Sequence, residues 1–327
     1  MSDGINISYD LSMAIACAFL LLLIIVLFIV CRKKPSKPQE SIQVRLSAQP
    51  WPLSDVHAAT DGFNPRRIIG KGQLGIVYVA ISTNGAAIAV KRINPGLVLS
   101  NAGFGFSSIM KSLSLANHPN IVPIVGFSEA PGERIILMQF MGMNSLEFYL
   151  HQSSSIGAST LDWSARIRIA AGAARGIEYL HQSMNPSIVH GCIKPSNILV
   201  DVNFSAKVCD YGMSYLGLQE RRCLVGYTDG ENGGACKEND VYGFGVVLLE
   251  LLSGRLCEGG LLVDWALPLI RNMGVVELLD PRLILPVDVK PLFRLAKLAS
   301  ACIGNSRHNR PSMVQVTTIL NNLEMQL

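Results

Sequence analysis

The chain has 327 residues, of which 49% are apolar and only 16% are charged, and its formal net charge is +4. This composition provides ample material for a buried core and predicts one large or two ordinary domains. The weak positive charge, without a basic helix or a platform of aromatic and basic residues, excludes a dedicated nucleic-acid-binding protein.

The first element is a long apolar run at residues 11–31, which reads LSMAIACAFLLLLIIVLFIVC and contains no charge and no proline. At a rise of about 1.5 Å per residue, a helix of this length spans the hydrocarbon core of a bilayer, about 30 Å thick. A buried core helix is the weaker interpretation, because nothing polar interrupts the run. A cleaved signal peptide would need a basic N-terminal region, yet Asp3 and Asp10 are the charges of the first ten residues.

Positive charges follow the run in CRKKPSK, at residues 31–37. The positive-inside tendency therefore predicts a short outer tail at residues 1–10, an uncleaved transmembrane helix at 11–31 and a cytoplasmic location for the rest. We expect a single-pass protein of the plasma membrane. Residues 32–50 contain Pro35, Pro38 and Pro50 among basic and polar residues, which is typical of an extended juxtamembrane linker beside an anionic lipid surface.

The eight cysteines form no CxxC pair, and none lies in the short outer tail. In a reducing cytoplasm such cysteines are expected to be thiols rather than disulfides or zinc ligands, so no structural metal is predicted.

The cytoplasmic part divides into a strand-rich and a helix-rich region. From about residue 65 to 150, β-branched runs such as IVYVAI and AAIAVKRI flank a turn, and the apolar run RIILMQFM at 134–141 indicates two more strand-like pieces. From about residue 160 apolar residues recur at helical spacing. Helices are predicted in SARIRIAAGAARGIEYLHQ, in DVYGFGVVLLELLSG and around 290–303 and 311–326. The expected fold class is α+β with two lobes.

A glycine-rich pattern, GKGQLGIV at Gly70–Val77, lies between strand-like segments. Glycines there let the backbone approach phosphates closely, although a plain hairpin is an equal alternative for this pattern alone. Fourteen residues after Val77, Lys91 ends an AVK sequence in a strand and could neutralise phosphate charge.

The most specific stretch reads HGCIKPSNIL at 190–199 and is followed by DYG at 210–212. With these motifs the chain resembles a protein kinase, and in particular the plant receptor-like kinases. The resemblance extends from Trp51 to Leu327 and includes SDVHAATDGF, LDWSARIRIAAGAARGIEYLH, DVYGFGVVLLELLSGR and NRPSM. It implies a kinase-like domain at 51–327, with a small lobe at about 51–141 and a large lobe at about 142–327.

The resemblance implies a nucleotide pocket with a defined set of residues. Three glycines would cover the phosphates, Lys91 would contact the α and β phosphates, and Asn197 and Asp210 would hold Mg²⁺. The remaining residues would surround the adenine ring and the hinge; the full nucleotide-binding set is Gly70, Gly72, Gly75, Val77, Ala89, Lys91, Met138, Met141 and Leu199.

Other residues match scaffold positions of the family. Asp240 would anchor the catalytic loop, and Arg310 would pair with Glu231. An apolar spine that ties the lobes together would contain Leu113, His190 and Tyr211.

The catalytic loop departs from the family at its central position. The His-Arg-Asp of an active kinase reads His190-Gly191-Cys192, although the adjacent Lys194 is retained. The missing aspartate orients the substrate hydroxyl and accepts its proton, and loss of such a base typically costs about 10²–10⁴ in rate. A thiol with a pKa of about 8.5 is mostly protonated at pH 7 and is a poor substitute.

Four further departures from the family accompany Cys192. Ile109 stands where a glutamate should pair with Lys91, and Leu224 replaces a threonine of the activation segment. Asp229-Gly230-Glu231 replaces Ala-Pro-Glu, and Gly191 removes an arginine that would grip a phosphorylated loop.

No catalytic residue is therefore assigned. The sequence predicts a membrane-anchored receptor-like pseudokinase, a scaffold or regulator that docks other signalling kinases or receptors, with ATP and Mg²⁺ as the ligands its pocket could still take. The alternative is a weakly active serine/threonine kinase that uses water or another carboxylate. A ligand receptor is disfavoured because about ten outer residues are too few for a folded domain.

Overall fold

The computed structural model describes residues 18–23, 47–82, 85–100, 105–152, 161–217, 225–229 and 235–326. The chain forms two units, Met1–Arg45 and Leu46–Leu327. In the first unit residues 18–23 are helical, while the rest of the predicted span at 11–31 and the linker up to residue 46 lie outside the described residues. No helix in these described ranges combines the length and apolar character needed to cross a bilayer.

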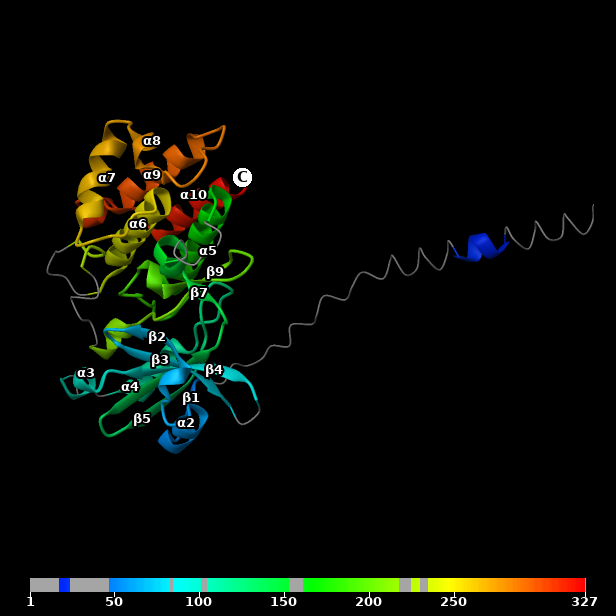
Figure 1. The fold of residues 1–327 in the computed structure, drawn as a ribbon, viewed down its shortest axis with the longest axis vertical. Helices are drawn as coiled ribbons and strands as arrows, with labels where there is room; N and C mark the ends of the chain where they lie inside the picture. Colours follow the sequence, from blue (N-terminus) through cyan, green and yellow to red (C-terminus); the bar gives the residue numbers. More distant parts are fainter. Residues whose placement is uncertain are drawn as a thin grey trace, which may run out of the picture. The chain divides into compact units, whose positions relative to one another are not determined.

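The small lobe is built on a six-stranded sheet (Figure 1). The strand order is β1-β5-β6-β4-β3-β2, and every neighbouring pair is antiparallel except β1 with β5. The strands are β1 (Gln49–Pro50), β2 (Ile68–Gly72), β3 (Gly75–Ile81), β4 (Ala87–Ile93), β5 (Ile124–Ala130) and β6 (Glu133–Gln139). The run at 134–141 therefore contributes one strand, β6, rather than the two pieces that its sequence indicated.

Short helices accompany this sheet: α2 (Leu53–Ala59), α3 (Pro95–Ser100) and α4 (Phe106–Leu113), with a 3₁₀ turn at Pro65–Arg67. Val56 of α2 is fully buried in a cluster with Phe63 and Tyr78. Ala48 is also buried, and its amide donates to the Ser114 hydroxyl at 2.8 Å. The compact unit thus includes residues that precede Trp51.

The large lobe is mainly helical and ends at the C-terminus (Figure 1). Its helices are α5 (Trp163–Gln182), α6 (Lys237–Ser253), α7 (Leu261–Arg271), α8 (Val275–Leu278), α9 (Lys290–Cys302) and α10 (Met313–Glu324). A small sheet, β7 (Asn144–Ser145), β8 (Ile198–Val200) and β9 (Ala206–Val208), and short helical turns at Phe148–Gln152, Pro195–Asn197, Met213–Leu216 and Arg307–Asn309 complete it. The helices predicted near 164–182, 240–254, 290–303 and 311–326 are confirmed.

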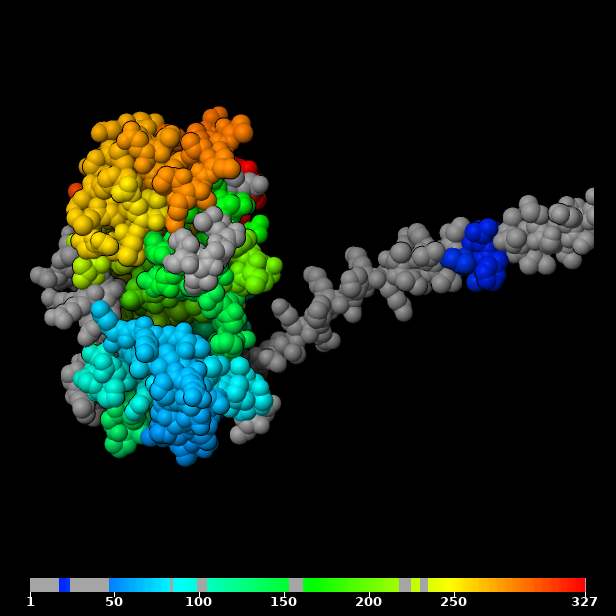
Figure 2. Space-filling view, viewed as in Figure 1, coloured from blue at the N-terminus to red at the C-terminus, as the bar shows by residue number. Residues whose placement is uncertain are grey.

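Helix α5 shows how the sequence positions the large-lobe core. The Asp162 carboxylate accepts a hydrogen bond from the Ala165 amide at 2.7 Å and caps the first turn. Small residues then allow a close approach of neighbouring backbone, because a Cβ at Gly176 would lie 2.5 Å from the Asn120 carbonyl oxygen. The predicted two-lobed fold with mixed strand and helix content is thus confirmed. In the view of Figure 2 the surface is recessed where the small lobe meets the large lobe.

Candidate functional site

The glycine-rich segment forms the tight hairpin between β2 and β3. Gly70 lies opposite Val77, and Gly72 lies opposite Gly75, which leaves a two-residue turn at the tip. A Cβ at Gly75 would lie 2.1 Å from the carbonyl oxygen of Arg92 on β4, so only glycine fits there. The predicted phosphate-covering glycines therefore share one turn at the edge of the small-lobe sheet.

The residues predicted to surround an adenine ring come from both lobes. Ala89 on β4 pairs with Met138 on β6, and both are buried. Met141 follows β6 in the connection to the large lobe and is half-buried. Leu199, on β8 of the large lobe, is also half-buried and packs against the main core.

Lys91 makes an ion pair with Asp210, 119 residues later in the chain. The Nζ of Lys91 donates to Oδ2 of Asp210 at 2.6 Å, and the two side chains are 6% and 17% exposed. Burial alone would lower the pKa of Lys91, but the charge and the hydrogen bond of Asp210 outweigh it and raise this pKa. The lysine is therefore charged at neutral pH, and its positive charge is directed at the predicted metal ligand.

Asn197 and Asp210, the predicted Mg²⁺ ligands, lie on adjoining segments. The Cys209 amide donates to the Asn197 carbonyl at 3.0 Å, which places the residue before Asp210 beside Asn197. Asp210 has a left-handed backbone with φ of 60°. An amide oxygen and a carboxylate are ligand types that Mg²⁺ accepts, so the chemical nature of both side chains suits the ion. Oδ2 of Asp210, however, is already bonded to Lys91. In the ranges described, no group of three or more His, Cys, Asp or Glu residues is suited to a metal ion.

The loop that carries Cys192 is held by hydrogen bonds to main-chain atoms. The amides of His190 and Gly191 donate to the two carboxylate oxygens of Asp240, at 2.7 and 2.8 Å. The Asn197 side-chain amide donates to the Cys192 carbonyl at 2.8 Å. Asp240 is 1% exposed on α6 and also bonds His181 at 2.8 Å. The anchoring role implied for Asp240 is confirmed by this geometry.

Cys192 itself is a buried, reduced thiol, 7% exposed. After burial and Asp210, Cys209 and Cys192 make smaller contributions that raise the pKa of Lys91. Burial raises the pKa of Cys209 well above its ordinary value. Lys194, the retained lysine of the loop, is half-buried and precedes the 3₁₀ turn at Pro195–Asn197. No carboxylate occupies position 192, where the resemblance implies the base.

His190 links the loop to the segment that ends in Asp210. Its Nδ1 accepts from the Cys192 amide at 3.2 Å, and its Nε2 faces the Cys209 carbonyl at 2.9 Å. Because a backbone amide can only donate and a carbonyl can only accept, the proton of a neutral ring is on Nε2. Complete burial lowers the pKa of His190 and favours this neutral form.

Gly191 lies in the left-handed region with φ of 80°. A Cβ there would lie 2.9 Å from the Ser214 hydroxyl oxygen. The missing arginine therefore cannot be restored without strain and a shift of Ser214. This obstacle is invisible in the sequence, because Ser214 belongs to a different segment.

Helix α4 brings an apolar face toward the Asp210 segment. A Cβ at Gly212 would lie 2.6 Å from the Leu113 side chain, and the Tyr211 hydroxyl approaches the Leu113 carbonyl at 3.4 Å. Ile109 lies four residues before Leu113 and so on the same face of the helix, half-buried and packed against the core. Two residues assigned to the spine, Leu113 and Tyr211, are therefore in contact. Ile109 stands at the position that the resemblance assigns to the lysine partner.

Arg310 pairs with Asp229 in the activation segment, at 2.9 Å. Arg307 also bonds this carboxylate, at 2.7 Å. The expected partner Glu231 and the altered position Leu224 lie outside the described residues. Sequence comparison alone did not assign a bonding role to Asp229.

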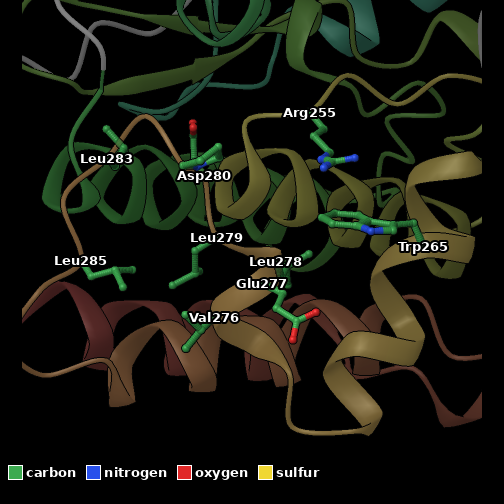
Figure 3. A pocket seen from close by; sticks show the side chains of 10 residues that line it. Arg255, Trp265, Val276, Glu277, Leu278, Leu279, Asp280, Leu283 and Leu285 are labelled. Atoms are coloured by element: carbon green, nitrogen blue, oxygen red, sulfur yellow. The ribbon is translucent and has the colours of Figure 1, made fainter.

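A cavity of about 540 Å³ in the large lobe shares no lining residue with the predicted nucleotide pocket (Figure 3). It is bordered by Trp265 of α7 and by the segment around α8, and Arg255 lies 4.0 Å from the centre of the Trp265 ring. None of the predicted functional residues lines it, so the candidate site remains the cleft between the lobes.

Comparison with known families agrees with this geometry. Residues 63–320 match the family described as protein tyrosine and serine/threonine kinase. A solved structure, the pseudokinase domain of BIR2, an immune regulator of the RLK/Pelle family, has 32% sequence identity and a TM-score of 0.71. The match covers 84% of this chain and 86% of that one.

Curated relatives come from Arabidopsis thaliana. The serine/threonine-protein kinase-like protein CCR2 is 35% identical over 274 residues, covering 82% of this chain and 33% of the relative. The proline-rich receptor-like protein kinase PERK2 is 33% identical over 307 residues, covering 88% and 42%. The chain thus spans about a third to two fifths of the length of these two relatives.

Proposed function

The chain belongs to the protein tyrosine and serine/threonine kinase family, among the receptor-like kinases of plants, and on that basis we propose that it is a pseudokinase that acts as a membrane-anchored signalling scaffold or regulator. The observation that carries this proposal is the thiol of Cys192, which stands at the base position of a loop whose other supports are intact.

Phosphoryl transfer depends on positioning and electrostatic stabilisation more than on covalent chemistry. A carboxylate at position 192 would orient the acceptor hydroxyl, whereas a thiol accepts hydrogen bonds poorly. The ion pair of Lys91 with Asp210 and the alkyl group of Ile109 also differ from the arrangement expected of an active kinase. Three supports of the transfer step are therefore altered together.

We further propose that the cleft still binds ATP. The proposal is supported by the predicted glycines in the β2–β3 turn, by the paired Ala89 and Met138, and by the buried positive charge of Lys91. Protein kinases generally use ATP together with Mg²⁺, and Asn197 and Asp210 are the residues at the positions where the family holds that ion. Nucleotide occupancy would then tune the surface offered to partners.

The membrane part of the proposal is supported by the apolar run at 11–31 and the basic residues that follow it. Other signalling kinases or receptors at the plasma membrane are the proposed partners, in keeping with the receptor-like relatives. Alkaline extraction of membranes and protease protection of a C-terminal tag test the anchor and its orientation. Release by alkali would contradict it.

Catalytic inactivity is tested by label transfer from ATP. The full chain, solubilised in detergent, is incubated with γ-labelled ATP and Mg²⁺ or Mn²⁺, with and without a generic protein substrate. Asp210→Asn, prepared identically, controls for contaminating kinases. We expect equal background signals for both proteins. Transfer by the native chain that disappears in Asp210→Asn would refute the pseudokinase proposal.

A second candidate function is a weakly active serine/threonine kinase. It is favoured by Lys194, Asn197 and Asp210, three residues of the family's catalytic machinery that this chain retains. The same transfer experiment decides between the two.

A further inference from the structure

The Lys91–Asp210 ion pair occupies the point where the family's metal chemistry would take place. The contact is short, 2.6 Å, and both side chains are largely buried. An opposite charge at this distance in a poorly hydrated site interacts more strongly than a surface pair does. The pair is therefore a substantial competitor for any ligand that needs either group.

The pair is explained by helix α4. Leu113 packs on the segment after Asp210, and Ile109 lies one turn earlier on the same helix face. An isoleucine offers no charge to Lys91. Since a buried ammonium group requires a counter-charge, Asp210 becomes the carboxylate that supplies it.

A divalent cation that binds Oδ2 of Asp210 would compete with Lys91, because Lys91 already donates a hydrogen bond to this oxygen. Asn197, the other predicted ligand, is a neutral amide whose nitrogen donates to the Cys192 carbonyl. The carboxylate is thus the charge that a cation would need most.

We propose that Lys91 is the resident cation of this cleft and that a nucleoside triphosphate binds there without a divalent metal. This inference rests on the proposed function only in that it requires a nucleotide-binding cleft. The triphosphate is held through Lys91, and metal adds no affinity because Lys91 already neutralises the carboxylate that would attract the metal. Ile109 is the residue that sets this preference, since a carboxylate at its position would release Asp210.

The inference is tested by calorimetric titration of the full chain in detergent with ATP, once in excess EDTA and once in excess Mg²⁺. We expect the native chain to bind ATP no more tightly in Mg²⁺ than in EDTA. Ile109→Glu gives Lys91 another partner, and we expect it to bind ATP at least about fivefold more tightly in Mg²⁺ than in EDTA, the lower end of ordinary coupling between sites.

Two matched variants separate charge from shape. Ile109→Gln has the size of Ile109→Glu without its charge and should show no preference for Mg²⁺. Asp210→Asn removes the carboxylate that holds Lys91 and repels phosphate, so it should bind ATP more tightly than the native chain in EDTA and show no effect of Mg²⁺. Melting temperatures of the apo proteins identify any variant that fails to fold, and Asp210→Asn then provides the decisive comparison.

Three results would overturn the inference: an affinity at least about tenfold higher in Mg²⁺ for the native chain, no ATP binding in either condition, or equal Mg²⁺ preferences for Ile109→Glu and Ile109→Gln. Label transfer measured on the same samples keeps the two proposals distinct. Turnover would refute the pseudokinase proposal, whereas the ratio of affinities in Mg²⁺ and EDTA tests the lysine.

Discussion

Removal of one carboxylate oxygen from Asp240 should destabilise the whole large lobe while the chemistry of position 192 stays unchanged. Asp240 accepts hydrogen bonds from the amides of His190 and Gly191 and from the ring of His181, and it is 1% exposed. In Asp240→Asn the new NH₂ group must face at least one of these donors. One buried donor is left unsatisfied, and the charge that strengthens the other bonds is lost.

The expected loss is about 3–5 kcal/mol, because hydrogen bonds to charged groups contribute about 1.5–3 kcal/mol each and a buried orphan donor costs a further 1–3 kcal/mol. That is a large part of an ordinary stability of about 5–15 kcal/mol, and it corresponds to a drop in melting temperature of about 10 °C. Urea denaturation followed by tryptophan fluorescence measures it. Asp264→Asn, at an exposed position of α7, is the matched control and should change stability by less than about 0.5 kcal/mol. A loss below about 1 kcal/mol in Asp240→Asn would refute the reasoning.

Three other outcomes are expected. Cys192→Asp alone should raise label transfer by less than about tenfold, since Lys91 still lacks a carboxylate partner on α4; a gain of about 10²–10⁴ would show that the base was the sole defect. Burial would raise the pKa of Asp280, but hydrogen bonds from two arginines outweigh it and lower this pKa to about 2. The resulting stabilisation, roughly 2.5 kcal/mol, is fully present above the unfolded pKa near 3.9 and is lost as the pH falls through about 2; acid denaturation of Asp280→Asn should lack this component, and an unchanged profile would contradict the assignment. Gly75→Ala should cost about 3 kcal/mol, measured by thermal melting, because its Cβ would lie 2.1 Å from the Arg92 carbonyl oxygen; a change within about 0.5 kcal/mol would show that the hairpin yields.

Much of the fold follows from local sequence patterns, whereas the defining contacts of the site do not. The long helix α5 was predictable because its capping aspartate and its apolar spacing lie within one segment. Strand β1 was missed, since two residues carry no periodicity and pair only with a strand far along the chain. The Lys91–Asp210 bond joins residues 119 positions apart. We attribute it to the absence of a carboxylate on α4 that could pair with Lys91.

A second contact that the motifs did not predict lies in the activation segment. Motif matching pointed to Glu231, which lies outside the described residues, as the partner of Arg310, and it did not point to the bond that Arg310 makes with Asp229. A motif fixes the order of residues, but it does not name every carboxylate that reaches a given guanidinium group. Position 192 was different, because flanking residues on both sides fixed its alignment.

The hydrogen bonds that hold the Cys192 loop involve its backbone and not the side chain at position 192: two amides donate to Asp240, and one carbonyl accepts from Asn197. A lineage can therefore exchange the reactive group at this position without losing the architecture that once presented it. Recognition surfaces can be inherited long after turnover has ceased, and selection for binding alone is enough to preserve them.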